Sequence, residues 1–306
     1  MEFRHVSILL NECIEGLAIS PNGTYVDATM GGAGHSRHIC SHLSAQGKFI
    51  GVDRDEEAFT VAKERLEDAI CEKQFIRSDF RNIGDYVTEP VDGILADLGV
   101  SSYQLDNKDR GFSYREDAVL DMRMDRSSPL SAKTVVNTYS LQQLAYIIST
   151  YGEEKFARSI AANIVKQREL KPIETTGELI EIIRRSMPQK SLREKHPAKR
   201  TFQAIRIEVN SELDSLKQGL ESFFSLLKPG GRMCIITFHS LEDRIVKEYF
   251  KSLVNVCTCP PEFPVCVCNK KTLAKIITKK PILPSEQEME ENPRSKSAKL
   301  RILEKL

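Results

Sequence analysis

Glycines and acidic residues recur at a spacing that suits a nucleotide-type ligand. Gly31, Gly32 and Gly34 follow a short apolar run, and Asp53 closes the next apolar run along the chain. A backbone without Cβ atoms can approach a ligand closely, and an acid after the second strand can accept hydrogen bonds from both hydroxyls of a ribose. These residue types at this spacing therefore predict a site for a cofactor that contains a nucleoside.

The glycine pattern also indicates which nucleotide fits. The dinucleotide fingerprint Gly-x-Gly-x-x-Gly would need a third glycine where Arg37 stands, so NAD and other pyrophosphate cofactors are disfavoured. Asp27, just before the glycines, would repel phosphates but would favour a cation. S-adenosyl-L-methionine carries a sulfonium and an ammonium, so a methyl donor fits this sequence better than NAD.

Further acids stand where parallel strands are expected to end. Asp79 and Asp97 each follow an apolar run, as Asp53 does. Ligands of doubly wound sheets bind outside the carboxyl ends of the strands, so three acids in register favour function over chance helix caps. For Asp97 alone, a loop-forming role remains the alternative. If the substrate is an exocyclic amine, Asp97 or the carbonyl of Leu98 could accept its N–H and free the nitrogen lone pair.

Two histidines stand near these strand ends. His35 is expected to open the helix whose first amides face the cofactor. His239 closes a late apolar run and is followed by Glu242. A catalytic role for His239 and a role in an N-terminal capping cluster both remain open.

The elements that must position these residues alternate along the first hundred residues. Apolar runs predict strands over 24–28, 48–52, 73–78 and 91–98, and helical periodicity predicts helices over 36–44 and 56–70. Strands that alternate with helices imply an α/β fold with a doubly wound, mostly parallel sheet.

The pattern changes after this sheet and then returns. Helices are predicted over 141–150, 153–167, 176–186 and about 201–227, with Ser140 and Thr175 as caps, and a buried strand resumes before His239. We therefore predict an α/β domain from residues 1–106 and 206–306, with an inserted helical domain, residues 107–205, that recognises the substrate. One or two antiparallel strands are expected near the C-terminus.

Composition limits the partners. With 44 Lys and Arg against 43 Asp and Glu, the net charge is +1, so any nucleic-acid surface must be a local patch. One basic segment could contact RNA phosphates or could be a solvated face: Arg184, Arg185, Lys190, Arg193, Lys195, Lys199, Arg200 and Arg206. Tyr103, Phe112 and Tyr114 could stack on an unpaired base or pack on their own domain.

Location and metal content follow from two further patterns. No apolar window is long enough to span a membrane and the first residues do not resemble a signal peptide, so a cytoplasmic protein is expected. Cys257, Cys259, Cys266 and Cys268 form two Cys-x-Cys pairs, which could hold a structural zinc ion or simply pack together. Because this spacing is tighter than that of usual zinc knuckles, we include no metal among the predicted sites.

The motifs taken together resemble a known family from near His5 to the C-terminus. They are Gly32-Ala-Gly-His-Ser, Asp53-Arg-Asp, Asp97-Leu-Gly-Val-Ser-Ser-Tyr-Gln-Leu-Asp, Arg110-Gly-Phe-Ser, Leu120-Asp-Met-Arg-Met-Asp, Tyr151-Gly-Glu-Glu, Arg200-Thr-Phe-Gln-Ala-Ile-Arg-Ile-Glu-Val-Asn, Pro229-Gly-Gly-Arg, Ser240-Leu-Glu-Asp-Arg-Ile-Val-Lys and Glu291-Asn-Pro-Arg-Ser. This set resembles the bacterial small-subunit ribosomal RNA methyltransferase H family, also called MraW.

The resemblance implies a class I methyltransferase that transfers a methyl group from S-adenosyl-L-methionine to N4 of a cytidine in the decoding region of 16S ribosomal RNA, within the small subunit. Carried over by position, the family's cofactor contacts fall on Ala33, Gly34, His35, Asp53, Phe80, Asp97 and Gln104. We assign the catalytic role to Asp97. Many amino-methyltransferases have Asp/Asn-Pro-Pro-Tyr where this chain has Asp97-Leu-Gly-Val, so the proton acceptor and the base-stacking residue remain open. The alternatives are another amine substrate or a non-catalytic RNA-binding assembly factor.

Overall fold

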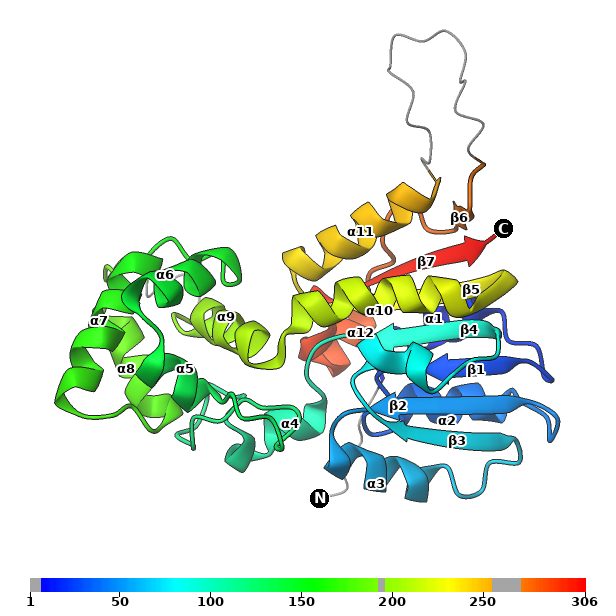
Figure 1. The fold of residues 1–306 in the computed structure, drawn as a ribbon, viewed down its shortest axis with the longest axis horizontal. Coiled ribbons are helices and arrows are strands. Elements are labelled where there is room, and N and C mark those ends of the chain that lie inside the picture. Colours follow the sequence, from blue (N-terminus) through cyan, green and yellow to red (C-terminus); the bar gives the residue numbers. More distant parts are fainter. Residues whose placement is uncertain (1–6, 192–195, 255–270) are drawn as a thin grey trace, which may run out of the picture. The chain divides into compact units, whose positions relative to one another are not determined.

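The computed structural model describes residues 7–191, 196–254 and 271–306 (Figure 1). The chain divides into two compact units, residues 1–99 with 213–306 and residues 100–212. The helical segment is thus inserted between two parts of the sheet-containing unit. Its limits lie a few residues outside the predicted 107–205, because the predicted boundary at 205/206 would cut a continuous helix, α9 (Lys199–Asn210).

Among its described residues, the sheet-containing unit holds seven strands. They are β1 (Thr24–Asp27), β2 (Lys48–Asp53), β3 (Glu72–Arg77), β4 (Val91–Asp97), β5 (Leu227–Thr237), β6 (Ala274–Ile276) and β7 (Lys299–Lys305). The order is β3-β2-β1-β4-β5-β7-β6, with β1 to β5 parallel and β7 antiparallel to both of its neighbours. This arrangement confirms the predicted doubly wound, mostly parallel sheet and the late antiparallel strands.

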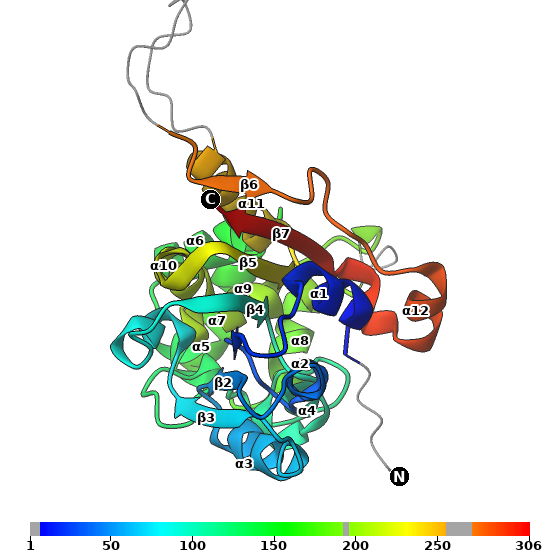
Figure 2. The same cartoon turned by 90° about the vertical axis from the view of Figure 1, so that its right-hand side faces the viewer.

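Helices cover both faces of this sheet (Figures 1 and 2). One core packs helices α1 (Leu10–Leu17), α2 (Gly34–Ser41) and α3 (Glu56–Arg65) against side chains such as Tyr25 and Phe49. The other core packs α10 (Glu212–Leu226) and α11 (Ser240–Val254) against Val26 and Ile50. Because neighbouring strand residues point to opposite faces, a nearly continuous apolar run such as β1 is buried on both sides. Shorter elements complete this unit: η1 (Phe80–Asp85), α12 (Glu286–Glu291) and η4 (Pro293–Ser297).

The inserted unit is helical. It contains α4 (Ser102–Asp106), η2 (Lys108–Arg110), α5 (Ala132–Thr138), α6 (Leu141–Thr150), α7 (Ala157–Leu170), α8 (Thr176–Arg185) and α9. These helices share one apolar core of their own. The predicted caps Ser140 and Thr175 each form a capping box with the residue three positions later, which explains where α6 and α8 begin.

Several predicted helices are wrong in their limits; the predicted helix 56–70, for example, already ends at Arg65. The predicted helix 201–227 is two helices, because Ser211 adopts the left-handed conformation at φ 50° and ends α9 before α10 begins. The predicted helix 153–167 begins only at Ala157, since Glu153 is also left-handed, at φ 47°. Just before it, a Cβ on Gly152 would lie 2.6 Å from the carbonyl oxygen of Arg200, so only glycine allows this approach.

One loop of the inserted unit is held by buried polar side chains. Arg110, 1% exposed, donates to the carbonyls of Arg123 and Met124. The side chain of Asn210 accepts from the Met124 amide and donates to the carbonyl of Met122. Met122 has a left-handed backbone conformation, with φ 60°. Because these donors and acceptors satisfy a buried, strained loop, three of the motifs in this part of the chain have a structural explanation.

Some predicted residues fall in the segments between the described ranges. Cys257, Cys259, Cys266 and Cys268 lie outside the described residues, as do Arg193 and Lys195 of the basic segment. Within the described ranges, no helix has both the length and the apolar character needed to cross a membrane.

Candidate active site

The candidate site lies where the strand order reverses. Strands β1 and β4 are neighbours in the sheet although two other strands separate them in sequence. Asp27 and Asp97 stand at the carboxyl ends of these two strands, and Asp53 ends the adjacent β2. In open α/β sheets the crevice outside such a switch point is where ligands bind. The fold therefore brings together three acids that the sequence analysis selected.

The glycine loop closes one side of this point. Gly31 (φ 49°) and Ala33 (φ 60°) both adopt left-handed conformations, which turn the chain sharply from β1 into α2. Arg65 on α3 donates to the carbonyl of Gly32 at 2.6 Å and pins the turn. Helix α2 then begins at Gly34, and the first amides of a helix have no partner within it. The loop thus presents backbone donors at the end of the sheet.

Asp53 anchors this loop. Its Oδ2 accepts from the Gly31 amide at 2.7 Å, and its Oδ1 accepts from the Asp55 amide at 2.8 Å. Burial raises the pKa of Asp53, and the two amide hydrogen bonds oppose that shift. Each carboxylate oxygen has a second lone pair, so the ribose role that we predict stays chemically open. Sequence reasoning missed the anchoring role, which depends on a contact between separate segments.

Asp27 is more enclosed than the sequence suggests. It is 1% exposed, and its oxygens accept from the Ser36 hydroxyl at 2.6 Å and from the Thr29 amide at 3.2 Å. Burial raises its pKa to about 6, against the effect of these hydrogen bonds. The predicted preference of Asp27 for a cation stays a prediction, since its side chain is almost inaccessible and is held by Ser36 and Thr29.

Asp97 carries an unsatisfied oxygen. Its amide donates to Oγ1 of Thr29 at 2.6 Å, which fixes the end of β4. Its buried Oδ1 finds no hydrogen-bond partner among the residues that the structure describes. Burial, together with the charges of Asp27 and Glu242, raises the pKa of Asp97 to about 8. A buried acceptor without a partner is costly to the fold, so a ligand group that supplies a proton or a positive charge would fit here.

The side chain of His35 faces the same carboxylate. Its Nδ1 lies 3.8 Å from Oδ2 of Asp97, and its Nε2 lies 3.0 Å from the carbonyl oxygen of Ile8. The ring is 6% exposed. The imidazole therefore connects the N-terminal segment to Asp97. Sequence reasoning found His35 but had no signal for Ile8.

His239 occupies a different arrangement. The strand β5 that leads to it is parallel to β4. Its Nε2 lies 3.1 Å from Oε1 of Glu242, and the Glu242 amide donates to its Nδ1 at 3.4 Å. Glu242 also accepts from the amides of Phe238 and His239. These contacts favour the capping cluster over a catalytic base, since the Glu242 amide donates to Nδ1 and the Glu242 carboxylate lies beside Nε2, which itself has no hydrogen-bond partner among the described residues.

The end of β3 is built differently from its neighbours. Asp79 accepts from Arg54, Arg81 and the Ser215 hydroxyl. Burial acts to raise its pKa, but the two guanidinium groups outweigh burial and lower it. Position favours a functional role for Asp79 over a helix cap, but its carboxylate accepts from protein donors and caps η1.

Phe80 begins η1 directly after Asp79. Its ring centroid lies 5.7 Å from that of Phe223 on α10. A Cβ on Gly219 would come within 2.6 Å of the Phe80 ring, so this glycine makes room for the aromatic ring. Phe80 is only half-buried, which leaves part of the ring for a ligand. Its predicted place beside the adenine remains a prediction.

Gln104 belongs to the inserted unit. Its Oε1 accepts from the amide of Ser101, and its own amide donates to the Ser101 hydroxyl, which makes a capping box at the start of α4. The side chain is 5% exposed. A cofactor contact for Gln104 remains a prediction, because the site residues above belong to the other unit.

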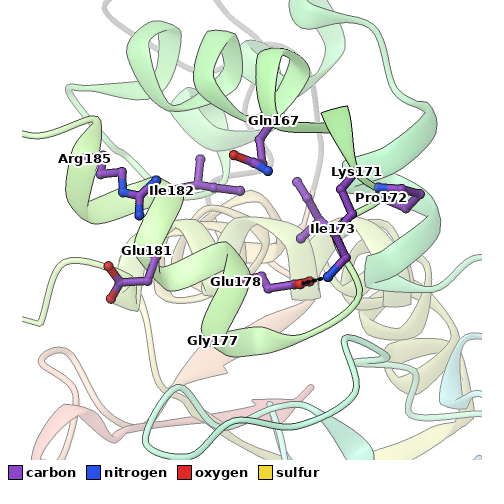
Figure 3. Close-up of a pocket in the computed structure, with 9 residues that line it drawn as sticks. All are labelled: Gln167, Lys171, Pro172, Ile173, Gly177, Glu178, Glu181, Ile182 and Arg185. Carbon is purple, nitrogen blue, oxygen red and sulfur yellow. Dashed lines mark hydrogen bonds and ion pairs between the residues drawn. The ribbon is translucent and has the colours of Figure 1, made fainter. Parts of the chain in front are cut away.

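The inserted unit has a pocket between α7 and α8 (Figure 3). Lys171 and Glu178 form an ion pair across it at 2.7 Å. Arg185 of the basic segment lines it, but none of the predicted cofactor or catalytic residues does. The lining residues are Gln167, Lys171, Pro172, Ile173, Gly177, Glu178, Glu181, Ile182 and Arg185. The pocket therefore offers no alternative place for the predicted chemistry.

The chain is similar to known proteins over its whole length. "Ribosomal RNA small subunit methyltransferase H" of Clostridioides difficile (strain 630) is 56% identical over 311 residues, and that of Finegoldia magna is 55% identical over 312, with 100% of each chain covered in both comparisons. A solved rRNA methylase from Streptococcus thermophilus has a TM-score of 0.45 and 14% identity, over 99% of both chains. This overlap is too low to assign the fold, which is assigned from the strand order instead. The MraW methylase family model matches residues 2–306, and the chain belongs to that family.

Proposed function

We propose that this protein transfers a methyl group from S-adenosyl-L-methionine to N4 of a cytidine in 16S ribosomal RNA. The observation that carries the proposal is the unsatisfied Oδ1 of Asp97 at the switch point of the sheet. Membership of a methylase family and relatives named as small-subunit ribosomal RNA methyltransferases support the reaction class and the substrate. The proposed substrate also favours a cytoplasmic location.

The residues at the switch point fit the methyl donor. Ala33, Gly34 and His35 would contact it through their backbone, and Asp53 would bind the ribose. Asp97, with the field of Asp27 behind it, would balance its positive charge. When bound, S-adenosyl-L-methionine supplies a methyl group activated by a cationic sulfur. The buried carboxylate, with its unsatisfied Oδ1, suits this donor better than it suits a phosphate.

Asp97 would also prepare the substrate. The lone pair of an exocyclic amine is delocalised into its ring, and a hydrogen bond from the amine to Oδ1 of Asp97 would increase its availability on nitrogen. A carboxylate fixed at the end of β4 by Thr29 would hold the amine in line with the methyl group. The carbonyl of Leu98 remains the alternative acceptor.

Replacing Asp53 by alanine is expected to weaken donor binding by about 1.5–3 kcal/mol, because the variant has neither charge-assisted hydrogen bonds to the ribose nor the anchor of the Gly31 amide. Isothermal titration with S-adenosyl-L-methionine measures this. Asp85, exposed on η1, gives a control of the same chemical type when changed to alanine. An unchanged dissociation constant for the Asp53 variant would rule out the ribose role.

The inserted unit offers cations for RNA. Arg184, Arg185, Lys190, Lys199 and Arg200 are all exposed. Arg206 is excluded from this set, because it pairs with Glu212 through two hydrogen bonds of 2.8 Å. Positive side chains that project into solvent from one segment can neutralise phosphates.

The three aromatic residues considered for base stacking divide into two groups. Tyr114 stacks on His196 with ring centroids 4.4 Å apart and contacts Phe202 edge to face, so it packs within its own unit. Phe112 is 6% exposed and likewise packs in the core. Tyr103 is 49% exposed and is our candidate for stacking on an unpaired base.

Changing Arg193, Lys195, Lys199 and Arg200 to glutamine is expected to flatten the dependence of RNA affinity on salt. The slope of log affinity against log salt should fall by roughly 0.7–0.9 for each phosphate that the variant no longer neutralises, while donor binding is unchanged. The double variant Lys199→Gln/Arg200→Gln can be compared with Lys217→Gln/Lys251→Gln, which removes two exposed lysines from the other unit. Equal slopes for the two double variants would assign Lys199 and Arg200 to a solvated face.

The proposed reaction is tested by incubating unmodified small subunits, and separately free 16S RNA, with the protein and labelled donor. Mass spectrometry of the nucleosides should find the label in N4-methylcytidine. Label on another nucleoside or on a protein would overturn the substrate assignment. Donor binding without any transfer would favour the non-catalytic assembly factor.

A further inference from the structure

We propose that the imidazole of His35 and the carboxyl group of Asp97 share one proton and act together as the proton acceptor of the reaction. The inference rests on the proposed methylation of an amine, which must lose a proton when it gains a methyl group. His35 would be a positioning residue that acts through Asp97. This role is separate from the backbone contact with the donor that the resemblance implies.

The contacts of the ring determine where its hydrogens lie. The carbonyl of Ile8 can only accept, so the nitrogen 3.0 Å from it, Nε2, carries a hydrogen. In the neutral ring, Nδ1 then has a lone pair, and this atom faces Oδ2 of Asp97 at 3.8 Å. The two groups can therefore hold one proton between Nδ1 of His35 and the carboxylate of Asp97. At 3.8 Å the two atoms must move closer to form a direct hydrogen bond.

Acidic groups near Asp97 disfavour a further negative charge on its carboxyl group. Asp27 from β1 and Glu242 from α11 both act on the Asp97 carboxyl, and the Cys13 thiol of α1 also lies within its field. Glu242 is itself engaged by His239. With these acids around it, the pair retains a proton in the absence of a cationic ligand. Positive charge brought by the donor would release this proton and leave Asp97 ready to accept another.

The proton balance of the reaction then closes. The nitrogen lone pair of the substrate forms the N–CH3 bond, and the electrons of the broken C–S bond stay on sulfur. The N–H bonding electrons stay on nitrogen, and the proton passes to the carboxylate of Asp97. It is then shared with Nδ1 of His35, whose Nε2–H is held by the Ile8 carbonyl. The next cationic donor returns this proton to solvent.

The first test uses the protein without donor or RNA. Nitrogen-15 NMR of the histidine rings should show hydrogen on Nε2 of His35, and the change Asp97→Asn should lower the titration midpoint of His35 by about one unit or more. His38, exposed on the same helix, should not shift. Identical His35 midpoints in the two proteins would overturn the shared proton, whatever the substrate proves to be.

The second test uses turnover. His35→Gln should lower kcat by about 100-fold, leave the dissociation constant of the donor within a few-fold, and move the acidic limb of the kcat–pH profile to lower pH. His38→Gln should behave as wild type. If kcat falls but the acidic limb of the kcat–pH profile does not move, His35 has only a structural role. Absence of methylation by the wild-type protein would count against the proposed function, and the NMR test would still decide the shared proton.

Discussion

Changing Asp97 to asparagine is expected to lower kcat for methylation by about 10²–10⁴-fold, with the affinity for RNA unchanged. Asparagine has nearly the same shape but cannot take the proton of the amine or balance a sulfonium charge. Single-turnover assays with labelled donor measure the chemical step, and filter binding measures RNA affinity. Near-normal turnover in the variant would transfer the acceptor role to the carbonyl of Leu98.

The same substitution should stabilise the fold. The pKa of Asp97 is raised to about 8 in the folded protein, so between about pH 4 and pH 8 the folded state binds the proton more strongly than the unfolded state does. Stability therefore falls as pH rises through this window, and the asparagine variant escapes that fall. The expected gain at pH 8 is roughly 1–3 kcal/mol, since the carboxyl is 23% exposed and partly screened.

Thermal unfolding at pH 5 and pH 8 checks the sign. The midpoint of Asp97→Asn should exceed that of the wild type at pH 8, and the difference should shrink at pH 5. Asp85→Asn, on an exposed residue, is the control. A destabilised Asp97→Asn protein would mean that the carboxylate is satisfied in the free protein, which would remove the observation that carries the proposed function.

The sheet could be predicted because its signals are local. Apolar runs, strand-end acids and the glycines that follow β1 lie close together in sequence, and the parallel topology brings β1 and β4 together without further information. The break at Ser211 could not be predicted in this way, since the segment contains neither glycine nor proline there. The helices on its two sides contribute to different hydrophobic cores, α9 to that of the inserted unit and α10 to that of the sheet-containing unit.

The site shows the same division between local and distant causes. Asp53 and Asp97 could be selected from position, but whether an acid remains available depends on distant partners. Arg54, Arg81 and Ser215 consume the carboxylate of Asp79, whereas Oδ1 of Asp97 lacks a donor among the described residues. No spacing rule in one sequence distinguishes these two outcomes, because the donors come from separate elements.

Affinity for the methyl donor is expected to fall by about 10-fold for each pH unit between pH 7.5 and pH 6. Below its raised pKa of about 8, the Asp97 carboxyl is protonated in the free protein, and a cationic donor must displace that proton before it gains the carboxylate. Burial of Asp27, with a pKa of about 6, adds to the decrease at the acid end of this range.

Calorimetry in two buffers with different ionisation enthalpies measures both the affinity and the proton. At pH 7, binding of S-adenosyl-L-methionine should release close to one proton from the wild-type protein and much less from Asp97→Asn, whose affinity should vary little with pH. S-adenosylhomocysteine lacks the sulfonium charge but keeps the ammonium, so its affinity should depend less on pH. The difference between the pH dependences of the two ligands measures the part that is due to the sulfonium. A pH-independent affinity in the wild type would show that Asp97 is already ionised before the donor binds. Asp97 could then accept a proton without a bound donor.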